Sequence, residues 1–100
     1  MSEYCPVIIC ADGNIFDSSL GHIQTLVSLS GDPDVLASIP KDVSPLLYLA
    51  SSLHCVIVDY ENQIYVDSLT PAQEEALDAL SEAGLIQNHR IGMPHESLKL

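Results

Sequence analysis

The stretch that decides the fold runs from residue 56 to residue 84 and reads VIVDYENQIYVDSLTPAQEEALDALSEAG. Its first half contains two short runs of β-branched and aromatic residues around a polar Glu61 and Asn62, which predicts a β-hairpin. Its second half repeats apolar residues at helical spacing, which predicts an amphipathic helix. The stretch therefore predicts a strand, a turn, a second strand and a helix.

Both ends of the predicted helix carry sequence signals. Thr70 is expected as the N-cap, Pro71 suits the first helical position, and Gln73 completes a capping box. Gly84 is expected to end the helix. We expect the apolar stripe to lie on the sheet with the carboxylates outward. The stripe consists of Ala72, Ala76, Leu77, Leu80 and Ala83.

The hairpin has a counterpart near the start of the chain. Residues 7–20, VIICADGNIFDSSL, align without gaps with residues 56–69, and five positions are identical. In the first copy, the pair Asp12 and Gly13 predicts a type I′ turn. A shorter helical pattern follows this copy and ends at Gly31. The sequence therefore predicts two ββα units; common ancestry and convergence both remain open as the origin of the repeat.

Two more helix starts are predicted between the units. Asp32 and Ser44 each stand before a proline, and Pro40 keeps the first of these helices short. The fold expected is α+β, a mainly antiparallel four-stranded sheet with three or four helices. Strands are predicted near 6–11, 14–18, 55–60 and 63–68, and the main helices near 20–30, 45–54 and 71–83. The length of the intervening segment leaves open whether the hairpins share one sheet.

The chain is expected to form a single domain over residues 1–100. Its 100 residues are 47% apolar, which suffices for one core but is too short for two. Residues 87–100 have weak periodicity interrupted by Gly92 and Pro94, so we expect a partly ordered tail there.

The charge is strongly one-sided. Fourteen acidic residues against three basic ones give a formal net charge of −11, which disfavours direct contact with nucleic acid or anionic lipid. Neither a membrane-spanning apolar run nor a signal-peptide pattern is present in the sequence. Three cysteines are an odd number, so we expect reduced thiols in a cytoplasmic protein.

Catalytic and metal-binding motifs are weak. His54 and Cys55 are adjacent, but neighbours at a helix-to-strand junction usually point to different sides, whereas a nucleophile and its base must meet. Cys5 and Cys10 lack the close spacing of zinc ligands. The DGNIFD segment lacks the alternating oxygen ligands of a calcium loop. We therefore expect no enzyme activity, no metal and no cofactor.

The acidic surface is the most informative feature. Glu74, Asp78 and Glu82 recur at i, i+4 and i+8, which places them on one helix face about 6 Å apart. One interpretation is a solvated face, and the other is a docking surface for a basic groove of a partner protein. The residues expected to support docking are Glu75, Asp59, Glu61 and Asp67.

In size and charge, the chain resembles small acidic proteins of phages and mobile elements, among them DNA mimics and some anti-CRISPR proteins. The resemblance implies a non-enzymatic inhibitor whose carboxylates occupy a basic, nucleic-acid-binding site of a partner protein. The alternative is a homodimeric α+β scaffold or regulatory module, since ββα units loosely resemble those of roadblock or profilin-like domains.

Overall fold

The computed structural model describes residues 6–59, 63–86 and 94. Four strands in this part of the chain form one antiparallel sheet with the order β2-β1-β3-β4. The strands are β1 (Val7–Ile9), β2 (Ile15–Asp17), β3 (Val56–Val58) and β4 (Ile64–Tyr65). The two hairpins therefore share one sheet, joined by the pairing of β1 with β3, and the predicted α+β class is confirmed.

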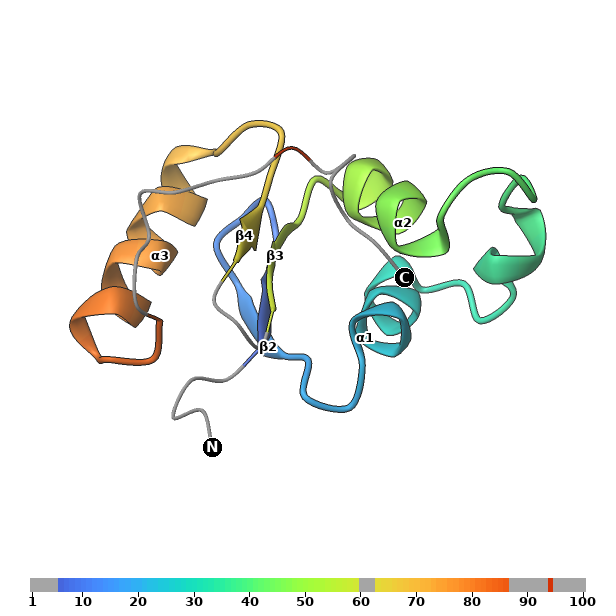
Figure 1. Cartoon of the computed structure of the whole chain (residues 1–100). Coiled ribbons are helices and arrows are strands. Elements are labelled where there is room, and N and C mark those ends of the chain that lie inside the picture. The colour runs from blue at the N-terminus through green and yellow to red at the C-terminus, as the bar shows by residue number, and fades with distance from the viewer. Residues whose placement is uncertain (1–5, 60–62, 87–93, 95–100) are drawn as a thin grey trace.

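Helices cover both faces of the sheet. They are α1 (His22–Ser30), α2 (Pro45–Leu53) and α3 (Pro71–Glu82), with a 3₁₀ helix η1 (Val35–Ser38) before α2. Figure 1 shows α3 on one side of the sheet and α1 with α2 on the other. The predicted helices near 20–30, 45–54 and 71–83 are thus confirmed, with small shifts at their ends.

The central strands are buried on both faces. Ile8 and Ile57 lie opposite each other and belong to the core beneath α1 and α2. The residues on either side of them in β1 and β3 point the other way and pack with Leu77 and Leu80 of α3. Continuous apolar strands are the pattern expected when helices cover both faces of a sheet.

The first hairpin turn corrects one prediction. A type I′ turn needs positive φ at both central residues, but only Gly13 (φ 92°) has it, while Asp12 does not. The N–H of Gly13 donates to the carbonyl of Cys10, and the N–H of Cys10 to the carbonyl of Asn14, both at 2.8 Å. This is a three-residue loop with a left-handed glycine. The Asp12 carboxylate favours it by accepting from the backbone N–H of Asn14 at 3.1 Å.

The second hairpin closes in the same way. The N–H of Asp59 donates to the carbonyl of Gln63 at 3.1 Å, and these residues align with Cys10 and Asn14 of the first copy. The turn between them, with the predicted Asn62, lies outside the described residues. The same is true of the predicted tail, apart from Pro94.

The capping predictions for two helices are confirmed. Thr70 Oγ1 accepts from the N–H of Gln73 at 3.1 Å, and Gln73 Oε1 accepts from the N–H of Thr70 at 3.0 Å. Ser44 caps α2 ahead of Pro45. The helix expected after Asp32 starts two residues late, at Val35, and is a 3₁₀ helix. Asp32 instead closes a turn, accepting from the N–H of Asp34 at 3.0 Å.

Candidate functional site

The candidate site is the outer surface of α3. Its acidic row, Glu74, Asp78 and Glu82, is exposed. The opposite side of the helix is buried through Gln73, Ala76, Leu77 and Leu80. Three members of the predicted apolar stripe are thus buried; Ala72 is half-buried, and Ala83 is exposed because it caps the end of the helix.

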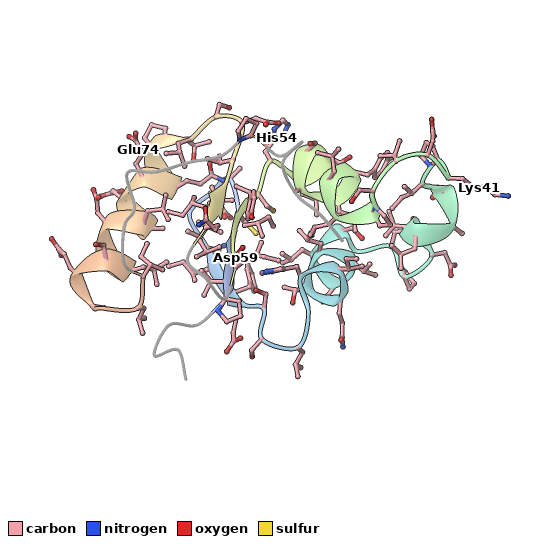
Figure 2. The ribbon with its side chains drawn as sticks, viewed as in Figure 1. Lys41, His54, Asp59 and Glu74 are labelled. Carbon is pink, nitrogen blue, oxygen red and sulfur yellow. The ribbon has the colours of Figure 1, made fainter. Side chains whose placement is uncertain are left out.

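The charge on this surface is not balanced within the helix. Residues 71–82 contain four carboxylates, Glu74, Glu75, Asp78 and Glu82, and no lysine or arginine. Lys41 is the single lysine or arginine within the described residues. Figure 2 shows Lys41 and Glu74 at opposite ends of the molecule. The helix α3 itself therefore carries a net negative charge.

The other predicted docking residues are dispersed. Glu75 is exposed on α3 itself, next to the acidic row. Asp67 borders a shallow hollow of about 490 Å³ with residues of α2, such as Tyr48 and Ser51, which belong to the opposite layer. Glu61 lies outside the described residues. The structure thus gathers Glu74, Glu75, Asp78 and Glu82 on one helix and places Asp67 by another.

Asp59 takes part in the closure of the second hairpin. Its Oδ1 accepts from the backbone N–H of Gln63 at 2.9 Å, and its Oδ2 accepts from the hydroxyl of Tyr65 at 3.3 Å. In Figure 2 it lies at the centre of the molecule, away from Glu74. Its position indicates a structural contribution to the hairpin rather than membership of the α3 surface.

Gln73 anchors the acidic helix to the rest of the protein. Its side chain is fully buried, and its Nε2 donates to the carbonyls of Ile9 at 3.2 Å and His54 at 2.8 Å. One amide therefore ties the first turn of α3 to the end of β1 and to the α2–β3 junction. The capping-box pattern predicted the Oε1 contact with Thr70 but gave no signal for these two.

The cysteine and histidine side chains considered for catalysis lie apart or are shielded. His54 is exposed at the left-handed end of α2 (φ 53°), whereas the adjacent Cys55 is buried. Burial raises the pKa of Cys55 to about 12, and the neighbouring Cys10 adds to the shift. A thiol with so high a pKa is a poor nucleophile at neutral pH.

His22 was not singled out by its sequence pattern. Both of its ring nitrogens are buried without a hydrogen-bond partner. Burial lowers the pKa of His22, and the negative charge of Asp59 opposes this shift. No group of three or more histidine, cysteine or acidic residues in the described ranges is arranged to hold a metal ion.

Comparisons with protein-family models, with curated proteins and with solved structures found no match to this chain. Within residues 6–59 and 63–86, each helix is too short or too polar to cross a lipid bilayer.

Proposed function

We propose that the protein is a non-enzymatic acidic binding protein, an inhibitor that presents the α3 surface to a basic, nucleic-acid-binding site of a partner protein. The observation that carries the proposal is the position of the acidic row. All three of its carboxylates are exposed on the side of α3 opposite its buried residues, in a helix without a basic residue.

The spacing of the row suits a basic groove. Successive members stand about 6 Å apart along a straight helix, so the row presents three carboxylates over about 12 Å. The row is also held firmly, since the capping box and the two Gln73 contacts fix the first turn of α3. A preorganised charged surface loses little conformational entropy on binding, and its field accelerates encounter with a cationic partner.

Charge reversal tests the proposal. The triple variant Glu74→Lys, Asp78→Lys and Glu82→Lys should keep the fold, because the three side chains are exposed. A matched control reverses Asp42, which is also exposed and lies outside α3. Compared with the single reversal Glu82→Lys, it changes the net charge by the same amount, from −11 to −9. The two single variants differ in where the charge is removed.

Affinity capture from a lysate of the source organism, at low and at high salt, supplies the readout. At low salt, we expect the wild type and the control to capture a cationic protein that the α3 variant fails to capture. High salt should release this protein. Its association rate with the α3 variant should be lower, since steering is lost. Equal capture by the wild type and the α3 variant would make the row a solvated face.

We further infer that the chain is organised as two ββα units. The equivalent hairpin closures at Cys10 and Asp59, and the pairing of the aligned residues Ile8 and Ile57, support this organisation. The helices that follow the hairpins nevertheless cover opposite faces of the sheet, α1 on the side of Ile8 and α3 on the side of Val7. The likeness between the units is therefore confined to their hairpins.

A homodimeric scaffold is the second candidate, favoured by the edge strand β2. Ile15 and Phe16 of this strand are 41% and 38% exposed, and β2 is an edge strand of the sheet that the described residues form. An exposed apolar edge can pair with another strand. Light scattering on the purified protein distinguishes the candidates, because edge pairing predicts twice the monomer mass and Phe16→Lys should restore the monomer.

A further inference from the structure

The helix layer opposite α3 contains an apolar hollow of about 620 Å³. It lies between α1, η1 and α2, and its lining includes Leu20, Ile23, Val27, Leu36 and Leu46. Leu20 is 84% exposed and Leu36 is 45% exposed, so two large apolar side chains on its rim face water. Clustered exposed apolar side chains of this kind commonly mark a binding surface.

A smaller hollow continues from the first along α1. Its volume is about 340 Å³, and the two hollows share Gln24 and Val27. It ends at Gly31, Asp32 and Pro33, just beyond the carboxyl end of α1. We call the two hollows together the α1 groove. It follows a helix of nine residues, which corresponds to about 13 Å.

The charged residues from β2 to η1 have one sign, and Lys41 follows η1 in the loop before α2. Residues 17–38 contain three carboxylates, on Asp17, Asp32 and Asp34, and no lysine or arginine. Asp32 lines the smaller hollow, and Asp34 is exposed two residues before the rim residue Leu36. The groove is therefore apolar at one end and negatively charged at the other.

We propose that the α1 groove binds an amphipathic basic helix of a partner protein, with its apolar side chains in the larger hollow and a cationic side chain beside Asp32 and Asp34. A helix laid along α1 presents apolar residues at i and i+4, about 6 Å apart, and a basic residue one or two turns further on. This pattern matches the apolar-to-acidic order of the groove. The proposal concerns a second surface and does not depend on the acidic row of α3.

Charge decides between a partner helix and a second copy of the chain. Two copies would each bring a net charge of −11 into contact, and their acidic ends would repel. A basic helix instead neutralises the carboxylates while its apolar face covers Leu20 and Leu36. The α1 groove thus favours a cationic partner over self-association.

The test uses the full chain and a synthetic probe. The probe is an amphipathic peptide of about 14 leucine and lysine residues, patterned at helical spacing. One control peptide has the same composition in strict alternation, and another has glutamate in place of lysine. Amide chemical shifts of the ¹⁵N-labelled protein locate the contact, and a titration gives the Kd. We expect shifts at Leu20, Ile23, Val27, Leu36 and Leu46 with the helical basic peptide.

Variants separate the groove from the acidic row. Leu20→Gln combined with Leu36→Gln should weaken binding about tenfold or more, as truncation of interface anchors does. Leu85→Gln, which changes a 42% exposed leucine outside the groove, should leave the Kd unchanged. Neutralising the row through Glu74→Gln, Asp78→Asn and Glu82→Gln should leave the shifts in the groove in place.

Three results would overturn the proposal. Shifts confined to α3 and lost with the neutralised row would show that the peptide senses only charge there. Equal affinity for the alternating or the glutamate peptide would remove the need for a basic helix. Shifts at Leu20 and Leu36 that grow with protein concentration, without peptide, would identify a second copy as the occupant. Because the two sets of variants differ, failure here leaves the α3 proposal standing, and the reverse also holds.

Discussion

Replacing Gln73 with alanine should destabilise the protein more than its single side chain suggests. The substitution removes the side-chain donor that Gln73 supplies to the carbonyls of Ile9 and His54. A buried polar group that loses its partner costs about 1–3 kcal/mol, so the two carbonyls together cost at most about 2–6 kcal/mol. Loss of the Oε1 contact to Thr70 adds to this, since it dismantles half of the capping box.

The measurement is urea unfolding followed by far-ultraviolet circular dichroism. A domain of this size typically has an unfolding free energy of about 5–15 kcal/mol, so the Gln73→Ala midpoint should fall markedly while the m-value stays unchanged. The control is Gln63→Ala, an exposed side chain, which should change stability by less than about 0.5 kcal/mol.

A second variant separates hydrogen bonding from packing. Gln73→Leu keeps most of the side-chain volume but cannot donate, so it should remain well below wild type if the carbonyl contacts carry the stability. If Gln73→Leu were as stable as wild type, Gln73 would contribute by packing alone, and a stabilising role of its hydrogen bonds to the two carbonyls would be refuted. The same conclusion would follow if Gln73→Ala and Gln63→Ala unfolded at the same urea concentration.

Three further predictions concern the backbone and two titrating groups. Gly13→Ala should destabilise the protein more than Gly31→Ala. Both glycines have positive φ, but a Cβ at Gly13 would also lie 3.0 Å from the carbonyl oxygen of Ala72, whereas a Cβ at Gly31 would meet no atom within 4 Å. Thermal unfolding of both variants tests this prediction. Burial raises the pKa of Cys55 from 9.0 to about 12, so above pH 9 the unfolded chain releases the thiol proton while the folded protein keeps it. The Tm of the wild type should therefore fall as the pH rises above 9. The Tm of Cys55→Ala should fall less over the same pH range. Burial lowers the pKa of His22 below 6.5, so stability should fall on acidification below that value, and His22→Leu should lose less Tm over the same range.

Local structure was largely predictable from the sequence because its signals are local. The capping box at Thr70, the proline after Ser44 and the glycine at the end of α1 each act within one helical turn, and the structure has all three. The turn at Asp12 was predicted wrongly because a dipeptide preference does not specify loop length. A carboxylate that bonds two residues ahead favours the three-residue loop.

The arrangement of the layers could not be predicted in the same way. Strands β1 and β3 are apolar at every position, so no alternation indicates which residues face which helix layer. The contacts of Gln73 span 64 and 19 residues of sequence, and no short pattern encodes them. Exposure of the row on α3, in contrast, follows from helical spacing alone. The α1 groove depends on how α1, η1 and α2 pack together, which the sequence leaves open.

The positions of the two candidate surfaces make their independence measurable. The α3 surface and the α1 groove lie on opposite sides of the sheet (Figure 1). Packed layers lie about 10 Å apart, as in stacked sheets, so about 20 Å separate the two helix layers. Substitutions that far apart, with no shared partner, usually have additive effects.

The number of partners decides how the two sets of variants combine. If the row and the groove bind different partners, the row reversal should abolish one interaction, and the Leu20 and Leu36 variants should weaken only the other. If one partner binds both surfaces, each set of variants should weaken the same complex. Combining the two sets should then weaken it by more than the sum of their separate effects on the binding free energy, because the linkage between the two sites is lost.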